Sequence, residues 1–117
     1  MHEFGLCEGL LGSVRRRANG RPVARVRVRA GIRHAVDEGS MAQAFSLIAQ
    51  GTEADGAALD LVIVPARVAC RTCGVEADTM DVLAVCPDCH GTDVKLIGGD
   101  ELVLESIEYA PAHPLAG

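Results

Sequence analysis

The stretch VACRTCGVEADTMDVLAVCPDCHG, residues 68–91, contains two Cys-x-x-Cys pairs separated by twelve residues. This spacing is close to that of a zinc ribbon. Two residues between paired cysteines allow a tight turn that directs both sulfurs toward one point, and four thiolates complete a tetrahedron around Zn²⁺. A closed shell of four ligands leaves no place for water or substrate, so the site is predicted to be structural. The predicted zinc ligands are Cys70, Cys73, Cys86 and Cys89.

Two glycines, Gly74 and Gly91, follow the two pairs and offer the positive φ values that such turns often need. The alternative interpretation is a redox Cys-x-x-Cys motif or a pair of disulfides. This alternative is less well supported, because two Cys-x-x-Cys pairs at this spacing are more typical of a metal site.

The cysteine-rich stretch is flanked by two segments that we expect to be strands. Leu59 to Val64 is rich in branched residues and is closed by Pro65, and Glu101 to Tyr109 has a similar character. Because the cysteine-rich stretch interrupts two strands that could pair, we interpret it as an insertion. This predicts a discontinuous domain, residues 1–68 and 99–110, a module at 69–98, and a loose tail at 111–117.

The N-terminal half shows two helical patterns around one strand. Apolar residues recur at three- and four-residue spacing up to about Ala18, and again from Met41 to Ile48 after a potential cap at Asp37. Between them, Val23 to Ala30 alternates with period two, which predicts a strand with one buried face and one arginine face. Cys7 shares the first helix's apolar face and is therefore predicted to be a buried thiol.

Composition indicates a folded protein with one modest core. Of 117 residues, 49% are apolar, 23% are charged and only 3% are aromatic. Because a small core with few large side chains is weakly stabilised, a bound metal ion that links segments of the chain would add useful stability. The chain has no apolar run of roughly 20 residues and no secretory signal pattern, so we expect no membrane span and a cytoplasmic location. In that reducing compartment, cysteines are more often metal ligands or buried thiols than disulfides.

The first three residues, Met1-His2-Glu3, supply an α-amine, a backbone amide, an imidazole and a carboxylate. The amine, the amide nitrogen of His2 and its imidazole can close fused rings around one metal ion, and Glu3 can complete the set. Nitrogen-rich planar sites suit Ni²⁺ or Cu²⁺. The residues alone leave the alternative open that this is an exposed terminus with no metal.

With these residues the chain resembles the HypA/HybF family of hydrogenase nickel-incorporation proteins. The matching stretches are the Met-His-Glu start, the first helix, Gly31 through Asp37 to Phe45, VPARVACRTCG at 64–74, CPDCHG at 86–91 and GGDELVLESIE at 98–108. The resemblance implies an α/β fold in which two helices and a three-stranded sheet carry an inserted zinc-ribbon-like module.

The resemblance also implies a function and its residues. The function is that of a nickel metallochaperone, not an enzyme, which delivers nickel to a [NiFe] hydrogenase large-subunit precursor together with a partner GTPase. Transient Ni²⁺ ligands fall on Met1, His2 and Glu3, and structural zinc falls on the four cysteines. A family acid matches Asp37, which could instead be only a helix cap. His34 is a possible extra ligand or a solvated loop histidine.

Two other functions fit parts of the sequence. A zinc-ribbon module that binds nucleic acid or protein is suggested by the eight of eleven basic residues that lie between Arg15 and Arg33, but a net charge of -5 and scarce aromatics argue against nucleic acid as a partner. The arginine face could instead dock an acidic protein or be solvated. A zinc deaminase needs His-x-Glu and an open zinc position, whereas His2 and Glu3 are adjacent here.

Overall fold

The computed structural model describes residues 2–81 and 85–111. Met1 and the predicted tail beyond residue 111 lie outside the described residues. In chain order, the elements are α1 (His2–Ala18), β1 (Val23–Gly31), a 3₁₀ helix (Ile32–His34), α2 (Glu38–Ile48), β2 (Ala58–Val64), β3 (Ala66–Cys70), β4 (Glu76–Thr79), β5 (Val94–Ile97) and β6 (Leu102–Tyr109). No helix in this part of the chain has the length and apolar character needed to cross a bilayer.

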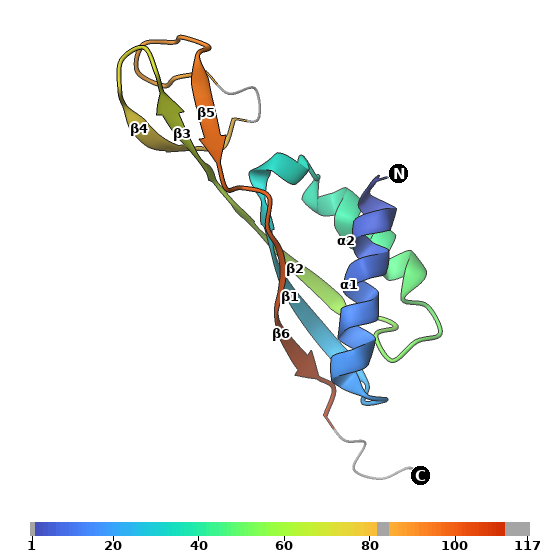
Figure 1. The fold of residues 1–117 in the computed structure, drawn as a ribbon. Coiled ribbons are helices and arrows are strands. Elements are labelled where there is room, and N and C mark those ends of the chain that lie inside the picture. The colour runs from blue at the N-terminus through green and yellow to red at the C-terminus, as the bar shows by residue number, and fades with distance from the viewer. Residues whose placement is uncertain (1, 82–84, 112–117) are drawn as a thin grey trace, which may run out of the picture. The chain divides into compact units, whose positions relative to one another are not determined.

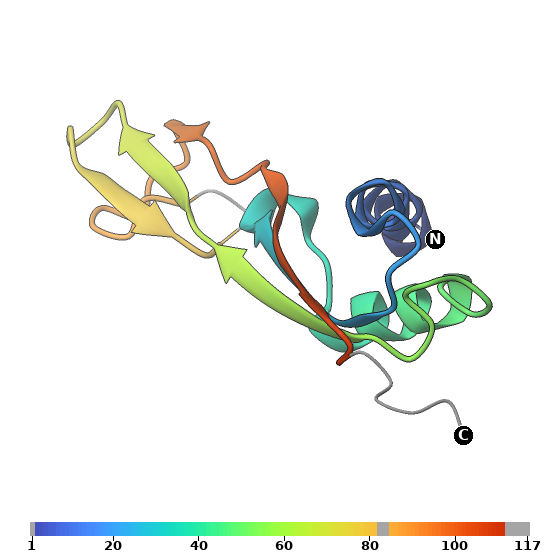
Figure 2. The same ribbon diagram turned by 90° about the horizontal axis from the view of Figure 1, so that it is seen from below.

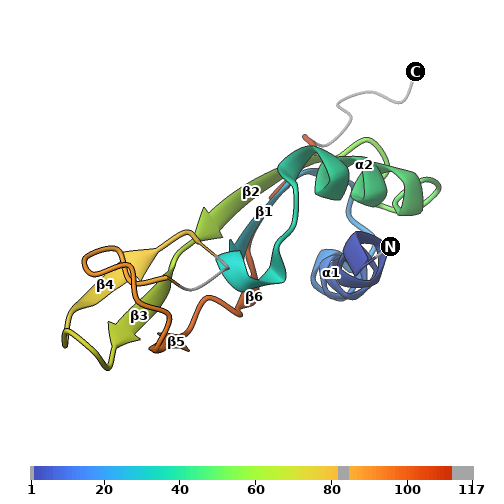
Figure 3. The same ribbon diagram turned by 90° about the horizontal axis from the view of Figure 1, so that it is seen from above.

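The strands form two three-stranded sheets, ordered β2-β1-β6 and β4-β3-β5 (Figure 1). The first sheet and the two helices confirm the predicted α/β fold, with the cysteine-rich segment inserted between β2 and β6. The second sheet was not predicted from the residues. In it, β3 pairs antiparallel with both neighbours, so that Val68 lies opposite Ala77 on β4 and opposite Leu96 on β5 (Figure 3).

The two helices pack against each other on one side of the first sheet (Figure 2). Their facing positions have the helical spacing expected from the sequence, and Phe45 and Met41 are the largest fully buried side chains. On β1, residues from Val26 to Ala30 alternate between buried apolar side chains and more exposed arginines, as the period-two pattern predicts. The buried helix residues are Cys7, Leu10, Val14, Ala18, Met41, Ala44 and Phe45.

By its internal contacts, the chain divides into two compact units. One unit contains residues 1–28, 37–60 and 104–117, with both helices, and the other contains residues 29–36 and 61–103, with the cysteines. The division falls within β1, β2 and β6. The domain boundaries that we drew from the sequence remain a prediction.

In the second unit, three small residues bring segments distant in the sequence into close contact. The N–H of Gly31 donates to the carbonyl of Glu101 at 2.8 Å, and the N–H of Arg33 donates to the carbonyl of Gly99 at 2.7 Å. A Cβ at Gly31 would lie 2.0 Å from the carbonyl carbon of Gly99. A Cβ at Gly99 would lie 2.6 Å from the Cβ of Ala66. Only glycine fits these positions without a backbone shift.

This close approach predicts a strong position dependence for glycine-to-alanine changes. Gly31→Ala should destabilise the protein by about 1–3 kcal/mol or more, because the new methyl group meets backbone rather than a flexible side chain. A Cβ added at Gly9, in α1, would meet nothing within 4 Å outside the helix's own backbone. The matched control Gly9→Ala should therefore stabilise by about 0.5–1 kcal/mol. Denaturant unfolding midpoints would measure the stability of both variants. Equal midpoints for Gly31→Ala and Gly9→Ala would contradict the close packing at Gly31.

Candidate metal centres

The first candidate centre is built by two knuckles in the second unit. Cys70 ends β3, and its carbonyl accepts the N–H of Gly74 at 3.0 Å, while the carbonyl of Cys86 accepts the N–H of His90 at 3.0 Å. These matching turns place both cysteines of each pair on the same side of their turn. The two turns therefore present the four sulfurs to one point, as predicted.

The glycines that follow the knuckles have different roles. Gly74 has a φ of 78°, as expected, but in the second knuckle the positive φ belongs to His90, at 64°. The expectation for Gly91 is therefore wrong. A Cβ at Gly91 would lie 3.2 Å from Sγ of Cys89, so a glycine here leaves room for the sulfur.

The distances between sulfurs fit a tetrahedral ion. Sγ of Cys70 lies 3.7 Å from Sγ of Cys89, and Sγ of Cys73 lies 3.6 Å from Sγ of Cys86. All four sulfur atoms lie within 4.8 Å of one another. A Zn–S bond of about 2.3 Å implies a tetrahedral edge of about 3.8 Å, so this donor set and spacing fit Zn²⁺.

Backbone N–H groups favour the thiolate form of the first cysteine in each pair. The N–H of Cys73 is the main cause that lowers the pKa of Cys70 to about 6, and the N–H of Cys89 is the main cause that lowers the pKa of Cys86. The pKa of Cys73 is raised to about 12: the N–H of Val75 lowers it, but burial and hydrogen bonds with neighbouring cysteines outweigh that effect. Since metal binds thiolates, these backbone N–H groups favour metal binding by the four-cysteine group.

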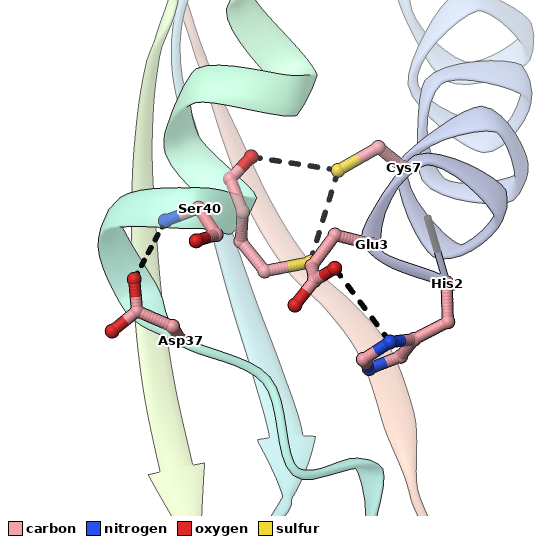
Figure 4. Close-up of polar contacts among 6 residues, drawn as sticks. His2, Glu3, Cys7, Asp37 and Ser40 are labelled. Carbon is pink, nitrogen blue, oxygen red and sulfur yellow. Dashed lines mark hydrogen bonds and ion pairs between the residues drawn. The ribbon is translucent and has the colours of Figure 1, made fainter.

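The second candidate centre lies at the start of α1 and includes Met1, which is outside the described residues. His2 Nδ1 lies 3.6 Å from Glu3 Oε1, with side-chain exposures of 56% and 19% (Figure 4). The pKa of Glu3 is lowered, first by a hydrogen bond from its own backbone N–H and also by His2. Because first-turn N–H groups have no helical acceptor, amide chemistry at His2 would break no helical bond.

Two further residues near this terminus have structural roles. Asp37 Oδ2 accepts the N–H of Ser40 at 2.9 Å, so Asp37 caps α2 (Figure 4). Cys7 is fully buried and its thiol donates to the carbonyl of Met41 at 3.5 Å, which confirms the predicted buried thiol. Burial, and then the charge of Glu3, raise the pKa of Cys7 to about 11. A role for Asp37 near nickel remains a prediction.

His34 and Arg25 have partners within the protein. A ring nitrogen of His34, in the second unit, lies 2.8 Å from the carbonyl oxygen of Asp100, so this histidine is held against the backbone. On β1, Arg25 donates to both carboxylate oxygens of Asp60 at 2.9 and 2.8 Å and lies 3.4 Å from Glu108. Arg25 thus links the three strands of the first sheet, and its charge is balanced within the protein.

Comparison with known proteins gives a consistent result. The family model "Hydrogenase/urease nickel incorporation, metallochaperone, hypA" matches residues 1–109. Over 111 residues the chain is 34% identical to the hydrogenase maturation factor HypA of Rhodobacter capsulatus, with 92% of this chain and 98% of the relative covered. It is 36% identical to HypA of Dehalococcoides mccartyi strain CBDB1, with 92% and 93% covered.

A solved structure agrees with these sequence matches. The solution structure of the Ni metallochaperone HypA from Helicobacter pylori aligns with a TM-score of 0.60 and 26% identity, and covers 92% of this chain and 96% of that one. The fold, the four-cysteine group and these matches together define a nickel metallochaperone of hydrogenase maturation. Maturation factors of this class are not enzymes. The chain belongs to the HypA family, as the resemblance implied.

The four-cysteine geometry predicts that Cys73→Ser loses most of its bound metal and unfolds the second unit at lower denaturant, because a hydroxyl replaces one of four thiolates. Metal content per chain by atomic spectroscopy and the unfolding midpoint would measure this. The matched control is Cys7→Ala, which removes the fifth cysteine and should leave the metal content unchanged. Full metal content in Cys73→Ser would show that the assignment of the site is wrong.

Proposed function

We propose that this chain binds one Ni²⁺ reversibly at its N-terminus and helps to insert it into the large-subunit precursor of a [NiFe] hydrogenase. The ligands in this proposal are the α-amine of Met1, the amide nitrogen and imidazole of His2, and Glu3. The observation that carries the proposal is that His2 and Glu3 open α1 with their side chains 3.6 Å apart, in a chain of the nickel-incorporation family.

The proposed chelate is suited to a cargo ion rather than a resident one. The His2 side chain in this chelate is 56% exposed, and nickel release requires only that protons return to the amine, amide and imidazole. The site has no intrinsic preference for nickel over copper, because divalent affinities rise from Ni²⁺ to Cu²⁺. Selection must therefore come from the partner that supplies the metal, which we propose is the nickel-handling GTPase of the same maturation system, acting in the cytoplasm.

In the same proposal, Zn²⁺ held by Cys70, Cys73, Cys86 and Cys89 is structural. The ion's contribution is to fix the two knuckles, and the module at 69–98 then serves as a rigid docking platform. The sulfur spacing described above supports this role, since all four sites of a tetrahedron are taken by protein ligands. The ion pairs of Arg25 with Asp60 and Glu108 reduce the basic surface that a nucleic-acid-binding function would use.

The proposal predicts that His2→Ala lowers nickel affinity by more than the roughly 10–100-fold that loss of an outer-shell partner costs, with the fold and zinc content intact. Calorimetric nickel titration of the untagged protein would measure this. A matched control is His90→Asn, which removes another exposed imidazole at a position whose φ of 64° asparagine tolerates.

A second control keeps every side chain. Acetylation of the Met1 α-amine replaces the amine by an amide without supplying a new amine, and it should weaken nickel binding as His2→Ala does. Equal nickel affinity in the wild type, His2→Ala and the acetylated protein would show that nickel does not bind at the terminus.

A further inference from the structure

The surface between the two helices contains a hollow of about 330 Å³ beside the proposed nickel ligands. We call it the helix hollow. Two of its residues come from the first turn of α1 and four come from successive turns on one side of α2. Its lining residues are Glu3, Phe4, Ser40, Gln43, Ala44 and Leu47.

The helix hollow has an apolar wall that the protein itself leaves open. Leu47 is 49% exposed, although Met41 and Phe45 on the same helix are fully buried. Among the described residues of the first unit, Leu47 is the only large apolar side chain this exposed. Phe4 is half-buried opposite it on α1. An exposed leucine beside an aromatic ring at the rim of a hollow is typical of a contact surface.

The charges at the helix hollow are acidic. Glu3 forms part of its wall, and Asp37 is bonded to the backbone of Ser40 at its rim. No lysine or arginine is among the lining residues. The arginines of α1, Arg15 to Arg17, lie in its last turn, about 16–20 Å along the helix from Phe4. An occupant that matches this surface therefore has an apolar side chain and a basic flank.

We propose that the helix hollow is the docking site for the protein that exchanges nickel with this chain, and that it receives an apolar side chain flanked by lysine or arginine. This inference depends on the proposed function. Glu3 is both a wall of the hollow and a proposed nickel ligand, so a partner seated there reaches the metal. A hollow this small holds one or two side chains, which suits the brief contact that cargo transfer requires.

The test compares two aspartate substitutions on neighbouring positions of α2. Leu47→Asp puts a charge against the apolar wall, whereas Ser46→Asp puts the same charge on an exposed position outside the hollow. The probe is the purified nickel-handling GTPase, titrated against the untagged chain. We expect Leu47→Asp to weaken association by at least about tenfold, as for loss of an apolar anchor, and Ser46→Asp to change it by less than about twofold.

Two further readouts separate this inference from the proposed function. Leu47→Asp should retain the wild-type nickel affinity, and wild-type association should weaken as salt is raised, because the partner's flank is basic. If association is absent in the wild type, or is the same in Leu47→Asp and Ser46→Asp, the docking site is wrong even when nickel binds at the terminus. If Leu47→Asp loses nickel or changes the oligomeric state, the hollow is instead part of the nickel site or a self-contact.

Discussion

The convergence of four sulfur atoms to within 4.8 Å of one another is the constraint on which the second unit depends. Its small sheet has strands of only four or five residues, and few of its apolar side chains are fully buried. Sheets this short rarely hold together through their own core. A bound Zn²⁺ would supply the missing stability, since it ties the end of β3 to the knuckle that precedes β5.

The two candidate centres differ in the chemistry of their donors, so they suit different metal ions. The knuckles offer four sulfurs, which suit Zn²⁺ or another thiophilic ion, whereas the start of α1 offers nitrogen and oxygen donors. Cys7 lies one turn after Glu3, yet it is buried, donates to the carbonyl of Met41 and has a raised pKa. This thiol therefore stays protonated in the core and does not compete for nickel in our account.

Features that depend on local spacing were predictable from the sequence. The Cys-x-x-Cys pairs, the two helices, the cap at Asp37 and the end of β2 before Pro65 all follow from short-range patterns. Features that depend on which distant segments come into contact were not predictable from the sequence. The small sheet was missed because β4 and β5 are four residues each, although Val94 to Ile97 carries a weak strand signal. The ion pairs of Arg25, the steric role of Gly91 and the helix hollow require knowledge of register and packing.

X-ray absorption spectra at the zinc and nickel edges, recorded on untagged protein as purified and then given one equivalent of Ni²⁺, would show whether one chain holds two metals through different donor atoms. We expect four sulfurs at about 2.3 Å around zinc and only nitrogen and oxygen around nickel. Sulfur in the nickel shell, or fewer than four sulfurs around zinc, would show that the two centres are wrongly assigned.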